Sequence, residues 1–533
     1  MRRCLVIATL TGALTLAGAA GHALAQAPGA APQQARQATP PRLHDRTQII
    51  VKFRDGTDPS AVMATALAGD RESYRPGGAV TLSEQATGAA VVDLSGILAQ
   101  PESGRGRFAV ERAAGRESTA QEALDALIER LNADPRVEYA QKDYLEFLDQ
   151  PSDAINAIIG GQSRAAPPPG TPGQEFSSPN DPFYHYQWHL KARGEAIGEA
   201  SAPGAANFPA AWAKFQPRRT VVVAVVDSGQ VYAHRDVLAE VMLPGYDMIS
   251  NVFVANDGDG RDGDPTDPGD AVAADECFEG SGQSPSTWHG SHVSGIAGAA
   301  ASNNGEGIAG PVVSGIRILP VRALGRCGGL TSDLADAMMW AAGFEVPGVP
   351  VNPNPASIIN ASFGGLADEC RPAYRDALRQ IRARGAIVVT TSGNEGFDAA
   401  RKSPANCEDA LVVAASDMNG RLTPYSNWGR DVDILAPGGD NGADLDGNGF
   451  PDGILSIVAD GHGVGQAGYD FFEGTSMAAP LVSAALALAL AHNPQDTVEE
   501  AVHRLLATAL PRSGAECPQP CGVGLLDVSA LID

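Results

Sequence analysis

Residues Thr220–Val226 read TVVVAVV, and this apolar run of mostly β-branched side chains decides the fold. It shows no alternation of polar and apolar residues, which is typical of strands buried on both faces of a sheet. Similar runs follow at Ile316–Val321, Ser357–Asn360, Ala386–Thr391 and Leu411–Ala415. Helical stretches such as Leu330–Ala342 and Tyr374–Arg384 fall between them. We therefore predict an α/β fold, a doubly wound parallel sheet with helices on both faces, whose functional side chains lie at the carboxyl ends of the strands.

A smaller unit lies upstream, between two linkers. The stretches Gln26–Pro41 and Gly160–Pro182 are rich in Ala, Pro, Gly or Gln and resemble extended linkers. The sequence between them has strand-like runs at Gln48–Phe53, Ala89–Leu94 and Val137–Asp143 and a helix-like stretch at Thr119–Asn132. This pattern predicts a small α+β domain. We divide the chain into a leader at 1–25, a linker at 26–46, the small domain at 47–148, a linker at 149–179 and the sheet domain at 180–533.

Composition and the N-terminal segment indicate an exported globular protein. The 533 residues include 63 acidic and 38 basic ones, and the net charge of −25 argues against nucleic acid and anionic membranes as partners. Arg2 and Arg3 precede a short apolar run that ends near Ala23-Leu24-Ala25, which is the pattern of a cleaved secretory signal. The most apolar later stretch, Ala478–Ala491, is too short to span a membrane and contains a proline, so we interpret it as a buried core helix. We expect a soluble, secreted protein.

The cysteines are consistent with export. Beyond the leader the chain has Cys277, Cys327, Cys370, Cys407, Cys517 and Cys521. An even number in an exported chain favours disulfides. The sequence does not choose among the possible pairings, and we favour the pairing of nearest neighbours along the chain. The alternative, a zinc site at Cys517 and Cys521, is disfavoured because no second pair of ligands lies nearby.

Four polar residues stand where a predicted strand ends or a helix begins. Asp227 ends the first buried run, in VVDSG, but it also suits a turn or helix cap. His289 lies in WHGSHVSG, where it forms either a metal pair with His292 or a structural histidine. Asn394, in TSGNEG, is suited to stabilise an oxyanion or simply to form a turn. Ser476, in GTSMAAP, opens an apolar helix, where a serine is most often an N-cap.

Together these segments resemble the four signature segments of the subtilisin-like serine proteases, the subtilases. The resemblance covers roughly residues 180–533 and implies a parallel α/β fold and hydrolysis of peptide bonds in proteins. It implies that Ser476 is the nucleophile, His289 the general base and then acid, and Asp227 the group that orients the imidazole. Asn394 would donate to the oxyanion. Ser228, Ser291, Ser294 and Phe363 differ from the residues most frequent in the family, which leaves the mechanism intact and the specificity open.

Two other segments acquire roles from the same resemblance. Ser362-Phe363-Gly364 is similar to the family's substrate-binding segment, whose backbone pairs with an extended peptide. The small domain resembles the inhibitor-type propeptide, which assists folding and blocks the cleft until it is removed. An independent binding module is the alternative for this domain. The linker at 160–182 would be the region of cleavage, because exposed Pro/Gly-rich chain is accessible to proteases.

Calcium is the predicted metal, since carboxylate and amide oxygens suit this ion. The first candidate group is the loop Asn256–Asp270, with Asp257, Asp259, Asp262 and Asp264. The second has part of an EF-hand pattern, with Asp444, Asp446, Asn448 and Asp452, but Leu455 replaces the closing Glu. The third, Asp236 and Asn304 with Asp181 as a further partner, is implied by the family resemblance. Solvated acidic turns are the alternative for all three groups.

We therefore expect a secreted, calcium-stabilised serine endopeptidase that is made as an inactive precursor. Its partners would be protein and peptide substrates and its own propeptide, and nothing indicates more than a monomer or an appended C-terminal domain. One rival is a catalytically dead subtilase used for binding, which the presence of all four site residues disfavours. Another is an α/β-hydrolase esterase, which is disfavoured because Ser476 lacks the Gly-x-Ser-x-Gly context.

Overall fold

The computed structural model describes residues 48–68, 80–94, 121–148, 179–278, 280–300, 302–311, 314–459 and 467–532. The predicted signal segment at 1–25, the first linker and nearly all of the second linker lie outside these ranges.

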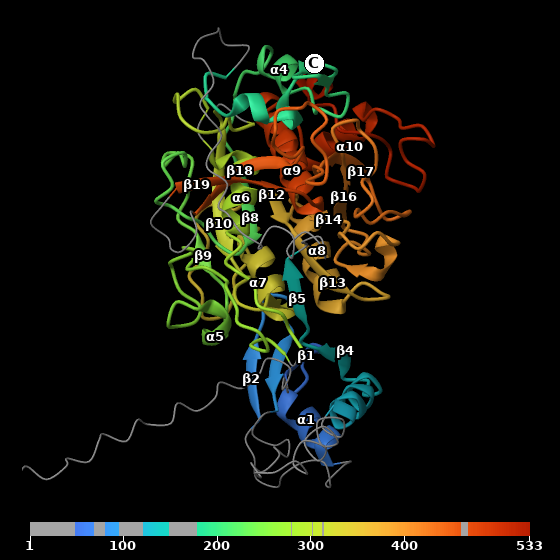
Figure 1. The fold of residues 1–533 in the computed structure, drawn as a ribbon. Coiled ribbons are helices and arrows are strands. Elements are labelled where there is room, and N and C mark those ends of the chain that lie inside the picture. The colour runs from blue at the N-terminus through green and yellow to red at the C-terminus, as the bar shows by residue number, and fades with distance from the viewer. Residues whose placement is uncertain are drawn as a thin grey trace, which may run out of the picture. The chain divides into compact units, whose positions relative to one another are not determined.

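A parallel sheet forms the centre of the larger domain (Figure 1). Its strand order is β17-β16-β14-β12-β8-β10-β9, and all its paired strands run parallel. The strands are β8 (Val221–Asp227), β9 (Tyr246–Asp247), β10 (Ile316–Arg322), β12 (Ile358–Ala361), β14 (Ile387–Thr391), β16 (Ala410–Ser416) and β17 (Ile434–Pro437). Strand β10 lies on one side of β8 and β12 on the other, so the strand order reverses at β8, and in such sheets ligands bind at the carboxyl ends of the strands at this point. The predicted fold class is confirmed.

Helices cover both faces of this sheet. On one face α6 (His289–Ser294), α9 (Thr475–His492) and α10 (Val498–Thr508) pack in one apolar core, and on the other α7 (Thr331–Ala341) and α8 (Pro372–Ala383) pack in a second. Among the described residues, α9 is the one helix long and apolar enough to cross a membrane, but 94% of it is buried inside the protein. The predicted core helix therefore extends three residues further toward the N-terminus, through Ser476.

The smaller domain is an antiparallel sheet of order β2-β3-β1-β4 with helices packed on it. Its strands are β1 (Gln48–Phe53), β2 (Thr81–Glu84), β3 (Ala90–Asp93) and β4 (Val137–Lys142), and its helices are α1 (Pro59–Ala68) and residues 121–132. Leu124, Leu127 and Leu131 recur on one helix face and are buried in the same core as Ile49 and Val92. This is the predicted α+β domain, with α1 and β2 as elements that the sequence analysis missed.

Short elements complete the chain. A four-stranded sheet has the order β11-β5-β13-β15, with β5 (Leu145–Leu148), β11 (Gly329–Leu330), β13 (Phe363–Leu366) and β15 (Lys402–Ser403). The hairpins are β6 (Ala196–Ile197) with β7 (Ala200–Ser201), and β18 (Ile454–Ala459) with β19 (Ala467–Phe472). Short helices are η1 (Tyr184–Tyr186), η2 (Trp188–Leu190), α4 (Phe208–Trp212), α5 (Val252–Ala255), η3 (Gly295–Ala299), η4 (Ala399–Arg401) and η5 (Val528–Ile532).

Three disulfides join the cysteines as nearest neighbours along the chain. They link Cys277 to Cys327, Cys370 to Cys407, and Cys517 to Cys521. The favoured pairing is therefore confirmed, and with all six sulfurs paired to one another the zinc alternative at positions 517 and 521 is excluded.

Candidate active site

Asp227 and His289 form a buried pair at the carboxyl end of β8, an interior strand of the sheet. Asp227 is the last residue of β8 and His289 the first of α6, and both are almost fully buried. Nδ1 of His289 lies 2.8 Å from Oδ1 of Asp227, which also accepts a 2.7 Å hydrogen bond from the backbone N–H of Ser228. A carboxylate held in this way fixes the orientation of the imidazole.

The turn before α6 brings the histidine close to this strand end. Trp288 has φ of +55°, and Gly290 lies so close to the turn after β8 that a Cβ there would be 2.4 Å from the carbonyl oxygen of Gly229. The backbone N–H of Gly290 donates to Ser228 Oγ at 2.9 Å. Ser228 is thus a further site residue, because it contacts both segments that hold the pair, and the sequence analysis noted it only as a departure from the family pattern.

Ser476 occupies the first turn of α9, beside the segment that follows β12. Its Oγ lies 3.5 Å from the carbonyl oxygen of Ser362, to which it donates. Pro480 has no N–H to donate to the carbonyl of Ser476 four residues earlier. That carbonyl instead accepts a 3.2 Å hydrogen bond from Ser362 Oγ. This hydrogen bond joins the start of α9 to the residue that follows β12. Helix α6 also packs against α9.

Asn394 is fixed by the residue that precedes Ser476. It lies three residues beyond β14 and is nearly buried. Its Oδ1 accepts two 2.9 Å hydrogen bonds from Thr475, one from the backbone N–H and one from the hydroxyl. These two bonds hold the amide oxygen against the first residue of α9 and so fix the orientation of the amide group. Thr475 is a second residue that the sequence analysis missed, since nothing in its type or position in the sequence marks this contact.

The predicted substrate segment is paired as a strand. Phe363 and Gly364 of β13 are antiparallel partners of Leu148 and Phe147 in β5 (Figure 1). Ser362, immediately before β13, is buried and its hydroxyl accepts a 2.9 Å hydrogen bond from Nδ2 of Asn360. Strand β13 is therefore paired along this edge with another strand of the same chain.

His292 is a structural histidine. Its ring stacks on Phe472 with centroids 4.1 Å apart, and its Nε2 donates to the carbonyl of Asp470 at 3.2 Å. Burial lowers the pKa of His292 to about 3, and the charge of His289 adds to this effect, so the ring is neutral. Neither histidine belongs to a group of metal-ligating side chains within the described ranges. The metal-pair alternative is therefore not supported.

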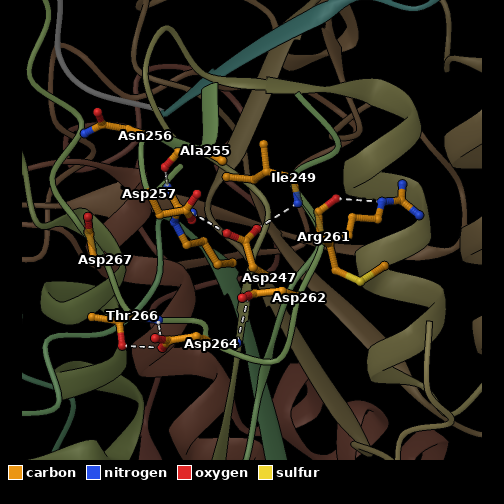
Figure 2. A network of polar contacts seen from close by, with 12 residues as sticks. Asp247, Ile249, Ala255, Asn256, Asp257, Arg261, Asp262, Asp264, Thr266 and Asp267 are labelled. Atoms are coloured by element: carbon orange, nitrogen blue, oxygen red, sulfur yellow. Dashed lines mark hydrogen bonds and ion pairs between the residues drawn. The ribbon is translucent and has the colours of Figure 1, made fainter. Parts of the chain in front are cut away.

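The acidic loop at 256–270 differs from the expected calcium site. Figure 2 shows Asp257 turned toward Asp247, and Asp264 turned toward Thr266. Asp257 Oδ2 accepts a 2.7 Å hydrogen bond from the buried guanidinium of Arg322, which also pairs with Asp247. The other carboxylates mostly accept hydrogen bonds from backbone N–H groups two residues further on. For example, Oδ1 of Asp262 accepts from the backbone N–H of Asp264 at 2.9 Å. The structure does not bring Asp257, Asp259, Asp262 and Asp264 together, because arginine pairing and local turns satisfy them.

The end of this loop instead supports the Asp–His pair. Asp267 accepts a 2.7 Å hydrogen bond from Ser228 Oγ, and Asp270 accepts from both the backbone N–H and the hydroxyl of Thr287, at 2.6 and 2.8 Å. The Thr287 hydroxyl accepts in turn from the backbone N–H of His289 at 3.3 Å. Burial, followed by the neighbouring Asp270 carboxylate, raises the pKa of Asp267 to about 7.

The second calcium candidate brings its carboxylates together. One oxygen each of Asp444, Asp446 and Asp452 lies within 4.8 Å of the others, and among the described residues this is the one such group of three. Asn448 lies beside them and donates from Nδ2 to Asp446 at 2.8 Å. An all-oxygen set of this charge fits Ca²⁺.

The residues of the third candidate also lie close together, and they hydrogen-bond to one another and to nearby backbone groups. Asp181 accepts from the backbone N–H groups of Asn303 and Asn304 at 2.9 and 3.2 Å. Asn304 turns its amide N–H, rather than its oxygen, toward Asp236 at 3.0 Å, and Asp236 also accepts from Ile308 at 2.8 Å. This group has two carboxylates, whereas three meet in the cluster at 444–452, so it supplies fewer anionic ligands for a cation.

Comparison with known proteins agrees with this geometry. The family model described as Peptidase_S8, subtilase family, matches residues 218–524. The chain is 38% identical over 356 residues to an extracellular protease of Xanthomonas campestris pv. campestris, covering 67% of this chain and 57% of that protein. It is 38% identical over 371 residues to an extracellular basic protease of Dichelobacter nodosus, covering 67% and 56%. The chain thus spans just over half the length of these curated relatives.

Solved structures give the same result. A structure titled as proteases from Pseudoalteromonas arctica PAMC 21717 is 42% identical, with a TM-score of 0.59, and the match covers 67% of this chain and 98% of that one. Fervidolysin from Fervidobacterium pennivorans, described as a keratinolytic enzyme related to subtilisin, is 20% identical with a TM-score of 0.58 over 91% of this chain and 61% of that one, and shows the fold alone. With more than half of its length matched by the family model, this chain belongs to the subtilase family of subtilisin-like serine proteases.

Proposed function

We propose that this protein is a secreted serine endopeptidase, made as an inactive precursor, that hydrolyses peptide bonds in proteins. The observation that carries the proposal is the 2.8 Å contact between His289 and Asp227 at the end of β8. The neighbouring strand β12 leads into Ser362, which contacts Ser476. Secretion is supported by the signal-like leader and by the names of the relatives, which include extracellular proteases.

The chemistry follows from the polar groups of the site. Ser476 Oγ attacks the carbonyl carbon of the scissile bond while Nε2 of His289 takes the hydroxyl proton. The resulting imidazolium donates through Nδ1 to Asp227 Oδ1. His289 then gives its proton to the leaving amine, which departs as the C–N bond breaks and leaves an ester on Ser476. Water, deprotonated by His289, attacks this ester, and the acid product leaves as Ser476 recovers its proton.

Asn394 would stabilise the negative charge that develops on the carbonyl oxygen. A donor contributes most when it is already oriented before the reaction, because no reorganisation is then needed in the transition state. The two hydrogen bonds from Thr475 support this role, since they hold the amide oxygen and thereby fix the orientation of the amide group.

The small domain would act as an inhibitor and folding aid. Its strand β5 occupies the edge of β13 that a substrate needs, which supports inhibition by substrate-like binding. The domain also caps two helices of the sheet domain: Asp143 accepts from the backbone N–H of Ser332 at 3.0 Å, and Gln141 from that of Ala373 at 3.1 Å. These bonds satisfy free N–H groups at the starts of α7 and α8, which supports a role in folding.

Calcium would be structural. Asp444, Asp446 and Asp452, with Asn448 beside them, are the residues that would hold it. A bound divalent cation would offset the repulsion among three carboxylates and stabilise the loop before β18.

The proposal is tested with the full chain, expressed, allowed to mature, and incubated with denatured casein. We expect cleavage at internal peptide bonds and release of a fragment containing the small domain. Ser476→Ala should abolish casein cleavage, and Ser513→Ala, which alters an exposed serine near the C-terminus, should keep it. Casein cleavage that persists in Ser476→Ala would overturn the assignment. If Ser476→Ala still loses the small domain, another protease performs the maturation.

A further inference from the structure

Glu146 is a fully buried acidic residue in the strand that occupies the proposed substrate edge. Its Oε1 lies 2.7 Å from Nε of Arg371 and accepts a 2.8 Å hydrogen bond from the hydroxyl of Thr331. Nη2 of Arg371 lies 3.5 Å from the other carboxylate oxygen. A buried carboxylate is costly unless it is paired in this way. Both partners of Glu146 come from the sheet domain, so they remain there after the small domain is removed.

The sheet domain holds Arg371 in place independently of Glu146. The backbone N–H of Arg371 donates to Ser403 Oγ at 3.1 Å, and its Nη2 donates to the carbonyl of Leu366 at 3.2 Å. The adjacent Cys370 is fixed by its disulfide to Cys407. These contacts keep the guanidinium at the side of β13 that faces the bound strand.

Strand β5 lies between β11 and β13, and we call the space that the Glu146 side chain occupies there the Glu146 slot. Glu146 pairs with Gly329 of β11 on one side, and its neighbour Phe147 pairs with Gly364 of β13 on the other. The slot requires a glycine in its wall, because a Cβ on Gly365 would lie 1.9 Å from Oε2 of Glu146. Any extended peptide that binds in the same register places one side chain in this slot.

Two positive side chains act on the carboxylate in this slot, although its burial outweighs them and the net pKa of Glu146 is raised. Besides Arg371, the positive charge of Lys402 on β15 acts on the Glu146 carboxylate. Burial raises the pKa of Glu146, while Arg371, the hydrogen bond from Thr331 and the charge of Lys402 act against that rise. An uncharged side chain in the same slot would leave the guanidinium buried without its partner, which is unfavourable.

We propose that Arg371 is a specificity-determining residue that selects peptide substrates with Glu or Asp at the position that Glu146 occupies. The proposal rests on the proposed function, because it treats β5 as occupying the substrate's place. The substrate class is therefore proteins with an acidic residue at one fixed position on the N-terminal side of the cleaved bond. Arg rather than Lys suits this task because its planar fork matches a carboxylate.

Cleavage-site profiling tests the proposal. The matured protein is incubated with a peptide library, and the cleaved bonds are mapped by mass spectrometry. We expect Glu and Asp to be enriched about 10-fold at one fixed upstream position. Arg371→Gln should abolish this enrichment while cleavage continues. Arg379→Gln, which alters a guanidinium whose side chain is 63% exposed, should keep it. Cleavage without acidic enrichment, or enrichment that survives in Arg371→Gln, would overturn the proposal.

A second measurement does not depend on catalysis. In the full chain with Ser476→Ala, hydrogen exchange of the amides of β5 reports how firmly the groove holds this strand. Glu146→Gln and Arg371→Gln should each speed that exchange, and the double variant should add little to either one. Arg136→Gln, which removes a guanidinium that is 43% exposed and pairs with Asp134 inside the small domain, should have no effect on β5. Unchanged exchange in Glu146→Gln and Arg371→Gln would contradict the recognition of an acidic side chain by Arg371. If exchange is faster in these variants but the unsubstituted protein cleaves nothing, the recognition is retained and the proposed function is rejected.

Discussion

Thr475→Val tests whether the orientation of Asn394 contributes to the reaction. The substitution keeps the shape of this fully buried side chain and removes one of the two donors to Asn394 Oδ1. The backbone N–H of residue 475 remains, so the amide oxygen keeps one partner. The net value of one such hydrogen bond is about 0.5–1.5 kcal/mol, which corresponds to a fall in kcat of about 2- to 10-fold. KM should change little, because Asn394 acts only once the oxyanion forms.

The assay measures kcat and KM of the matured protein on a chromogenic peptide. Asn394→Ala removes the donor itself and should lower kcat by about 100- to 1000-fold, a magnitude carried over from subtilisin-type oxyanion donors and not worked from this chain. Thr423→Val is the matched control, because it removes a buried hydroxyl that donates to the carbonyl of Ala415 at 3.2 Å. It should leave kcat unchanged. An unchanged kcat in Thr475→Val, or a change confined to KM, would refute the reasoning.

Three further predictions concern stability, measured as the free energy of unfolding in the full chain with Ser476→Ala. Replacing both cysteines by Ala should cost about 4 kcal/mol for the 277–327 disulfide, whose sequence separation is 50, and about 2 kcal/mol for the 517–521 disulfide, whose separation is 4. Equal losses would contradict the loop-length argument. Burial raises the pKa of Asp336 from 3.8 to about 6, so its contribution should fall by about 3 kcal/mol as the pH rises from 3.8 through 6. Asp336→Asn should therefore flatten the decline between pH 4 and pH 7, and an unchanged slope would show that another group causes it. Chelator should lower the free energy of unfolding of this Ser476→Ala chain and have a smaller effect once Asp452→Asn is added, and equal effects would reject the cluster at 444–452 as the calcium site.

Buried strands and helices were predictable because their patterns are local. The run at 220–226 needs no partner to indicate a strand that is covered on both faces, and its observed counterpart is β8. Strand β9 has only two residues, so no pattern can form within it. Strand β5, LEFL, is also short, and it is a strand because β11 and β13 supply its hydrogen bonds. Such elements depend on tertiary contacts and are invisible in the sequence alone.

The residues of the candidate site likewise include some that local patterns indicate and others that only tertiary contacts bring together. Asp227 and Asn394 were predictable as site residues because they follow buried runs, and the carboxyl ends of parallel strands share one edge of a sheet. The sequence does not show which of the acidic loops brings its carboxylates close together. The loop with Asp257 and the loop with Asp446 look alike in sequence, and the difference arises because Arg322 reaches the first loop from β10. The pairing of Glu146 with Arg371 joins residues 225 positions apart and has no local signature.

The most direct test of the whole account is covalent labelling of the matured protein with a serine-directed phosphonate, followed by mapping of the modified residue. We predict one adduct, on Ser476, and a large loss of labelling in His289→Ala, because the serine is a weak nucleophile without its base. Absence of an adduct in a folded, matured protein, or an adduct on another serine, would contradict it.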